Sequence, residues 1–183
     1  MKKVLTVILS CTFTALAVTC AFLCFQTSKT GLGNGTATRW NEEVENFAEA
    51  ISDGCNTDKE KVDSFYCWLI DNIEYDYAYN EIFQYFDAQK TLKTRKGLCY
   101  DYANLFAAFC RSQNIPCYVV DGYNRYDSLD RHTWNRVYYE DSWWNLDVTS
   151  DAISTLQGKA LYGFHPITSY DAEDEDYVIT RIY

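Results

Sequence analysis

The chain has 183 residues, of which 48% are apolar and 17% aromatic, and it carries 16 Lys and Arg against 26 Asp and Glu. Residues 39–183 contain 13 of the basic residues and all 26 acidic ones, which gives this part a net charge of −13. That charge disfavours nucleic acid and anionic membrane surfaces as partners. The apolar content excludes an intrinsically disordered chain.

The first 25 residues are typical of a targeting or anchoring segment. Lys2 and Lys3 precede an uncharged run from Val4 to Phe25, which is long enough to span a bilayer as one helix. A cleaved signal peptide is the alternative, although the apolar run continues beyond the A-x-A-like site at residues 15–17. In both cases the positive flank stays inside and the rest of the chain is exported. We therefore expect an extracytoplasmic protein, membrane-anchored or secreted, that meets the membrane only through this segment.

The exported part divides into a linker and one domain. Residues 26–38 are rich in Gly, Ser, Thr and Asn, a composition typical of a flexible linker. Residues 39–183 are the size of a single domain.

Apolar residues at helical spacing open this domain. They predict a helix that begins at Trp40 and is closed by Gly54. A second helix is predicted from Asp58, as its N-cap, to Ile73. The short connection between the two predicts an antiparallel helical hairpin.

The middle of the domain is less regular. Residues 75–96 contain many aromatic side chains without a clean period, which indicates a loop and a short helix. After Gly97 the 3.6-residue period returns and predicts a third helix, which ends at Asn114 and Pro116.

Strands follow the third helix. A short buried strand is predicted over residues 117–120, ending at Gly122, and alternating patterns predict two more over 134–140 and 143–149. Helices followed by a meander of strands are typical of an α+β domain whose helices pack on one face of an antiparallel sheet.

Cys99 stands at the start of the third helix, where a nucleophile can be activated. A cysteine must be a thiolate to attack, and free cysteine, with a pKa of about 8.5, is mostly protonated near neutral pH. A helix N-terminus and a nearby imidazolium both stabilise the thiolate. In an exported chain with eight cysteines, a disulfide or a place in the core are the alternatives for this residue.

A histidine and an aspartate are predicted to meet on two neighbouring strands. A two-residue turn at Glu140-Asp141 places His132 opposite Thr149 and makes Asp147 its diagonal neighbour, within reach of a side-chain hydrogen bond. A turn one residue later keeps both on the same face but lengthens the diagonal. A surface histidine and a solvated aspartate are the alternative.

These residues lie in motifs that resemble the transglutaminase-like superfamily. The matching blocks are Gly97-Leu98-Cys99-Tyr100-Asp101-Tyr102-Ala103, Asn114-Ile115-Pro116-Cys117, His132-Thr133-Trp134-Asn135-Arg136-Val137 and Trp144-Asn145-Leu146-Asp147-Val148-Thr149. The resemblance covers roughly residues 55–151. Thr133 departs from the usual alanine, and Ser150-Asp151 replaces an aromatic residue often found there.

The resemblance implies a papain-like fold and a catalytic triad. Cys99 would be the nucleophile, His132 the general base and acid, and Asp147 the residue that orients the imidazole. The reaction would be acyl transfer on peptide or protein amide bonds through a thioester, released by water or by an amine. The alternative is a non-catalytic groove that binds a peptide. No metal or other cofactor is expected, because the sequence has only two histidines and no C-x-x-C pair.

Several residues have no assigned chemistry at this point. Tyr75 is expected to line the core or a groove, although it could help to stabilise an oxyanion. The acidic run 173–176 is expected to be a solvated face, and residues 152–183 have no predicted role in the site.

Four other cysteines of the domain could pair in an oxidising compartment. Cys110 and Cys117 are better placed for a bridge than Cys55 and Cys67, because Cys67 lies well inside the second helix. Free buried thiols are the alternative.

Overall fold

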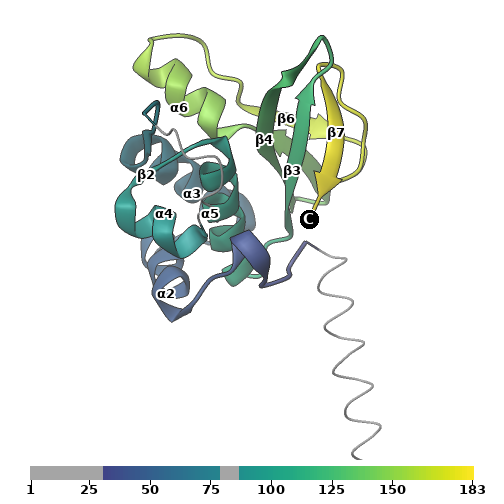
Figure 1. Cartoon of the computed structure of the whole chain (residues 1–183). Coiled ribbons are helices and arrows are strands. Elements are labelled where there is room, and N and C mark those ends of the chain that lie inside the picture. The colour runs from purple at the N-terminus through teal and green to yellow at the C-terminus, as the bar shows by residue number, and fades with distance from the viewer. Residues whose placement is uncertain (1–30, 79–86) are drawn as a thin grey trace, which may run out of the picture.

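A computed structural model gives the fold of residues 31–78 and 87–183 (Figure 1). A group of helices lies beside a five-stranded antiparallel sheet, in agreement with the predicted α+β architecture. The predicted anchor or signal peptide, residues 1–25, and part of the predicted linker lie outside the described residues. Within the ranges that the structure does describe, no helix is both long and apolar enough to cross a membrane.

The first two helices confirm the predicted helices. Helix α2 spans Glu42–Ile51 and helix α3 spans Asp58–Asn72. The N-cap of α3 is Thr57, so the prediction of Asp58 as N-cap is wrong by one residue. Thr57 accepts a hydrogen bond from the backbone N–H of Glu60, and the Glu60 carboxylate accepts one from the Thr57 N–H, which is a capping box.

The irregular middle segment contains the short helix that was expected. Helix α4 spans Ala88–Thr94, with Asp87 as its N-cap. Two very short strands flank this region: β1, Glu74–Tyr75, pairs in parallel with β2, Lys96–Gly97. Strands of two residues are too short to produce a detectable period, so the sequence pattern missed them.

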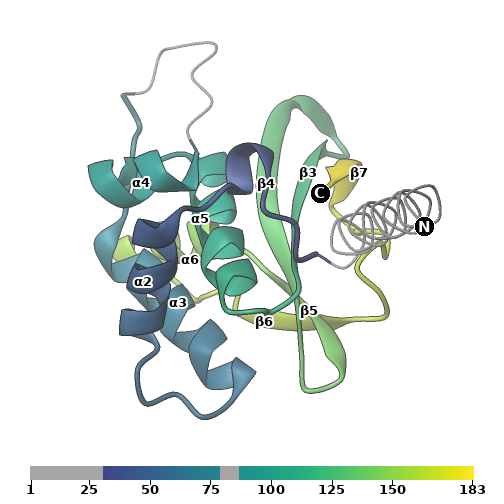
Figure 2. The same cartoon turned by 90° about the horizontal axis from the view of Figure 1, so that it is seen from below.

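Helix α5, Cys99–Ser112, is the centre of the fold and confirms the third predicted helix. It lies between the other helices and the sheet, as Figure 2 shows from below. The Phe109 ring packs against Phe47, Phe65 and Trp68, with ring centroids 5.6–5.9 Å apart. Each fully buried side chain of this size contributes about 1.5–3 kcal/mol to stability. These contacts therefore hold α5 against α2 and α3.

The sheet has the strand order β6-β5-β4-β3-β7, and every pairing is antiparallel. The strands are β3, Cys117–Asn124; β4, Asp127–Tyr139; β5, Ser142–Leu146; β6, Phe164–Ile167; and β7, Tyr177–Ile182.

The first of these strands does not end at Gly122, as the sequence suggested. Gly122 pairs with His132 on one side and with Ile179 on the other, where the register shifts at a bulge. A Cβ at Gly122 would lie 2.9 Å from the Trp134 ring and 3.0 Å from the carbonyl oxygen of Val178. Glycine therefore marks a close approach within the strand and not its end.

The β4–β5 hairpin has the predicted register. Glu140 and Asp141 form the two-residue turn, both with positive φ, and Tyr139 pairs with Ser142. The third predicted strand, 143–149, is too long by three residues. Strand β5 ends at Leu146 because Asp147 becomes the N-cap of helix α6, Val148–Leu156.

The end of the predicted linker is packed against the domain. Residues 36–38 form a short 3-10 helix, η1, and Thr38 is fully buried. The Arg111 guanidinium on α5 donates hydrogen bonds to the Gly33 carbonyl, the Thr38 hydroxyl and the Tyr183 carbonyl. One buried cation thus ties residues 33–38 to the last residue of the chain.

The five cysteines of the described domain are free thiols. Cys110 and Cys117 are both fully buried, and the neighbouring Cys117 adds to the effect of burial in raising the pKa of Cys110. Cys110 and Cys117, the pair that the sequence favours for a bridge, are therefore free buried thiols, which is the alternative expectation.

Candidate active site

Cys99 is the first residue of α5, and strand β2 delivers the chain to this point. The backbone N–H of a first-turn residue has no partner within its helix. The side chain of Leu98, the N-cap, cannot accept a hydrogen bond, so the first-turn donors remain directed towards this end of the helix. Cys99 is partly exposed, so its sulfur lies where the helix dipole stabilises a negative charge and a substrate can approach.

Asp101 fixes the start of this helix. Its Oδ2 accepts a hydrogen bond from the Leu98 N–H at 2.8 Å. A Cβ at Gly97 would lie 2.4 Å from the Cβ of Asp101, so only glycine fits two residues before Cys99. Burial raises the pKa of Asp101 to about 6, against the lowering effect of the hydrogen bond from Leu98.

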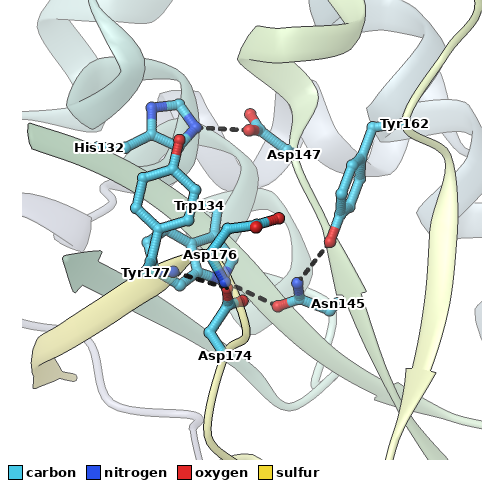
Figure 3. Close-up of a pocket in the computed structure, with 8 residues that line it drawn as sticks. All are labelled: His132, Trp134, Asn145, Asp147, Tyr162, Asp174, Asp176 and Tyr177. Atoms are coloured by element: carbon cyan, nitrogen blue, oxygen red, sulfur yellow. Dashed lines mark hydrogen bonds and ion pairs between the residues drawn. The ribbon is translucent and has the colours of Figure 1, made fainter. Parts of the chain in front are cut away.

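His132 lies on β4, opposite Gly122 of β3. Its ring stacks near Trp134 at a centroid distance of 6.1 Å and lies 5.6 Å from the ring of Tyr177. The imidazole Nε2 is hydrogen-bonded to Oδ2 of Asp147 (Figure 3). With Nε2 engaged in this way, Nδ1 is the ring nitrogen left to interact with Cys99, which contributes to the raised pKa of His132.

Asp147 lies at the junction between β5 and α6, where it serves two partners. Its Oδ1 accepts a hydrogen bond from the Ser150 N–H at 2.9 Å, and its Oδ2 accepts one from the Ser150 hydroxyl at 2.6 Å. The same Oδ2 faces His132. The structure thus brings together Cys99, His132 and Asp147, the three residues that the sequence singles out, with His132 between the other two.

The charges of this group support one another. Burial lowers the pKa of His132, but the hydrogen bonds to Asp147 and Cys99 outweigh it and raise the pKa to about 10. Burial raises the pKa of Asp147, and the hydrogen bonds from His132 and Ser150 reverse this and hold it below its ordinary value. An imidazolium flanked by an ionised carboxylate is therefore the favoured state at neutral pH.

An open pocket adjoins the His132–Asp147 pair (Figure 3). Its lining also includes Trp134, Asn145, Tyr162, Asp174, Asp176 and Tyr177. Four of these residues come from the segment 152–183, for which no role in the site is predicted from the sequence. Two belong to the acidic run, which was expected to be only a solvated face. Asp176 is exposed, whereas Asp174 is half-buried and accepts hydrogen bonds from the N–H groups of Asp176 and Tyr177.

A polar network supports the floor of the pocket. Asn145 accepts a hydrogen bond from the Trp134 indole at 2.8 Å and donates one to the Tyr162 hydroxyl at 2.8 Å. The buried Arg136 donates to the Asn145 side chain and to the carbonyls of Tyr170 and Ala172. Sequence spacing alone could not have found this network, because it joins two strands to a segment without regular structure.

No metal site accompanies these residues in the described ranges, where no group of three or more His, Cys, Asp or Glu side chains is placed to hold an ion.

Comparisons with solved structures identify the same fold elsewhere. A proposed cysteine protease from Cytophaga hutchinsonii superposes with a TM-score of 0.57 and 21% identity, over 83% of this chain and 52% of that chain. The periplasmic domain of TgpA from Pseudomonas aeruginosa gives a TM-score of 0.53 and 18% identity, over 67% of this chain and 47% of that chain. At these identities the likeness concerns the fold.

Sequence comparisons identify the family. The chain is 32% identical over 130 residues to the kyphoscoliosis peptidase of Homo sapiens, and the mouse protein gives the same identity. The alignment covers 62% of this chain but only 20% of the human protein. A profile described as the transglutaminase-like superfamily matches residues 45–148. Because this match covers more than half of the sequence, the chain belongs to the transglutaminase-like superfamily.

Proposed function

We propose that the domain is a cysteine-dependent acyl-transfer enzyme that acts on amide bonds of peptides or proteins. The observation that carries this proposal is that His132 is hydrogen-bonded to Asp147 and lies close enough to Cys99 for the cysteine to raise the pKa of the imidazole. A peptide-binding groove without catalysis would not need a buried carboxylate to hold an imidazolium beside a thiol.

The first half-reaction forms a thioester. The Cys99 thiolate attacks the amide carbonyl carbon, and a tetrahedral intermediate forms with a negative charge on the oxygen. The His132 imidazolium then gives its proton to the amide nitrogen, the C–N bond breaks and the amine leaves. Asp147 keeps the imidazole in the orientation and tautomer that this transfer needs.

Two donors are candidates for the oxyanion. The first is the N–H of Cys99 itself, at the N-terminus of α5. The second is the hydroxyl of Tyr75, because the pairing of Tyr75 with Gly97 holds this residue beside the start of α5. Burial raises the pKa of Tyr75, and the negative charge of Cys99 raises it further, so the phenol stays protonated and can donate.

The second half-reaction releases the acyl group. Neutral His132 removes a proton from water or from an acceptor amine, which attacks the thioester carbon. The C–S bond breaks, and Cys99 leaves as a thiolate beside the restored imidazolium. Water as the acceptor gives hydrolysis, and an amine gives transamidation.

We place this activity outside the cytoplasm. The support comes from the sequence, where Lys2 and Lys3 precede 22 uncharged residues. Fractionation of cells that produce the full chain tests this location. Recovery with membranes supports an anchor, recovery from the medium with a shortened N-terminus supports a cleaved signal peptide, and recovery in the cytoplasm contradicts both.

Trapping of the acyl-enzyme tests the reaction. The domain is incubated with a peptide library, quenched in acid and digested, and the peptide that contains Cys99 is examined by mass spectrometry. We expect an acyl adduct on Cys99, accumulation of the adduct when the acceptor is limiting, and no adduct in Cys99→Ser. Absence of any adduct over a broad library, with the domain folded, would favour the binding groove.

A further inference from the structure

We propose that Ser150 is a positioning residue for catalysis, whose hydroxyl holds the Asp147 carboxylate in the orientation that His132 requires. This inference rests on the proposed function. Ser150 does not touch a substrate in this role and acts only through Asp147.

Asp147 accepts two hydrogen bonds from Ser150, of which one caps helix α6 and the other positions the carboxylate. The Ser150 N–H binds Oδ1, which is the ordinary N-cap bond of α6. The Ser150 hydroxyl binds Oδ2 at 2.6 Å, and Oδ2 is the oxygen that faces His132. Removal of the hydroxyl therefore leaves the cap in place, and Oδ2 is then held only by His132.

A carboxylate needs this second restraint because its terminal torsion is broad and has no sharp staggered minimum. One bond to Oδ1 allows the group to swing about that bond. With both oxygens held, Oδ2 stays in the plane in which it meets Nε2 of His132. The hydroxyl also stabilises the anion, since a hydrogen bond to the charged form favours that form.

The first turn of α6 is a rigid base for this contact. The buried Asp151 carboxylate accepts hydrogen bonds from the Tyr66 hydroxyl on α3 and from the N–H groups of Tyr162 and Gly163. These bonds tie the turn that carries Ser150 to α3 and to the segment that follows α6. Catalytic groups are held best when their supporting residues are themselves fixed in this way.

Charged groups around Asp147 determine how much the hydrogen bonds from Ser150 matter to its ionised form. His132 on β4 favours the anion, and Cys99 on α5 acts on it through His132. The pocket beside Asp147 is lined by Asp174 and Asp176, and by the phenols of Tyr162 and Tyr177. The two carboxylates there repel a further negative charge. The hydrogen bond from the Ser150 hydroxyl stabilises the Asp147 anion against this repulsion.

The test compares three variants on two measurements. Ser150→Ala removes the hydroxyl and keeps the N–H, Ser150→Thr keeps a hydroxyl, and Ser154→Ala is a control one turn further along α6. The measurements are the rate of Cys99 alkylation by iodoacetamide as a function of pH, and kcat on a substrate found by trapping. Thermal unfolding of each variant reports on the helix cap.

We expect Ser150→Ala to lower kcat about tenfold, with a smaller effect on KM, and to slow the alkylation of Cys99 at about pH 6. Ser150→Thr and Ser154→Ala should behave as the parent. A merely structural serine would lower the unfolding temperature without slowing the alkylation of Cys99. An unchanged profile in Ser150→Ala, or a Ser150→Thr profile as displaced as that of Ser150→Ala, would overturn the inference. Failure of the proposed function is distinguishable, because the parent Cys99 would then alkylate like an ordinary thiol.

Discussion

His132 and Asp147 are hydrogen-bonded through Nε2 and Oδ2, although the paired register of β4 and β5 ends at Asn135 and Leu146, before it reaches either residue. The pairing of β4 with β5 directs the two side chains towards each other, and the turn into α6 brings the Asp147 carboxylate within hydrogen-bonding distance of His132. Asp147 is therefore both the end of a strand and the N-cap of a helix. The turn from β5 into α6 therefore determines both the position of Asp147 and its contact with the imidazole.

Asp147→Asn should abolish most of the turnover and preserve the fold. Asparagine caps helices as well as aspartate does, so α6 should keep its N-cap bond from Ser150. The amide cannot hold an imidazolium and favours the wrong tautomer, for which a loss in kcat on the order of 10⁴ is expected. Steady-state kinetics and circular dichroism on the same preparation measure both effects.

Asp147→Ala is the matched control for the cap. It should lose turnover to a similar extent and also lose about 1 kcal/mol of stability, because the N-cap bond is gone. If Asp147→Asn retained near-parental kcat, Asp147 would not orient His132 during the reaction.

The sequence was sufficient to predict that Cys99, His132 and Asp147 lie together, because each of them belongs to a strong local pattern. Gly97 and the helical period place Cys99 at a helix start. The turn at Glu140-Asp141 fixes the register that brings His132 towards Asp147. The resemblance to the transglutaminase-like superfamily rests on these same blocks.

The rest of the site could not be read from the sequence for physical reasons. Helix α6 begins on residues that continue the alternation of β5, and the N-cap bond from the Ser150 N–H to Asp147 marks where the helix begins. Strands β6 and β7 are half-exposed edges with weak apolar patterns. Tyr162 and Asp174 reach the pocket through tertiary contacts that no local period encodes.

Cys99 should be alkylated by iodoacetamide at about pH 6 far faster than the other cysteines of the domain. Cys67 is the informative comparison because its side chain is exposed, whereas Cys110 and Cys117 are buried. Partial burial, followed by the charges of Asp63 and Asp71, raises the pKa of Cys67, so it is accessible but mostly protonated. We expect a rate ratio between Cys99 and Cys67 of at least about tenfold, measured by mass spectrometry of digested samples.

His132→Ala should reduce this ratio selectively, because it removes the imidazolium and leaves the accessibility of Cys67 unchanged. A non-catalytic groove gives a different result. Cys99 would then react like Cys67 in the parent protein, and His132→Ala would have no effect on either residue.

The contribution of His132 to the stability of the domain should be lost in alkaline solution. The pKa of His132 rises from its ordinary 6.5 to about 10 in the folded state, so the folded state holds a proton that the unfolded state has lost. The stabilisation is complete below about pH 6.5 and disappears as the pH rises towards 10. Urea unfolding at several pH values should show a loss on the order of a few kcal/mol in the parent across this range.

His132→Ala isolates this contribution from other groups that titrate over the same range. Its free energy of unfolding should fall less steeply between pH 6.5 and 10 than that of the parent. Parallel curves for the two proteins would mean that His132 gains no proton on folding. The lowered pKa of Asp147 acts at the other end, because its contribution is present above the ordinary value of 3.8 and is lost as the pH falls further.

Tyr75→Phe should lower kcat by roughly 10², the usual cost of removing one oxyanion donor, and should leave KM nearly unchanged. The ring remains, so its contact with Tyr77 at 4.8 Å is kept and the pairing of β1 with β2 is not disturbed.

Tyr77→Phe is the matched control, since Tyr77 is 72% exposed. Alkylation of Cys99 should be equal in the two variants because the reaction with iodoacetamide develops no oxyanion. Equal kcat values for Tyr75→Phe and the parent would leave the N–H of Cys99 as the donor to pursue. A loss of alkylation together with kcat would instead place Tyr75 among the groups that hold the thiolate.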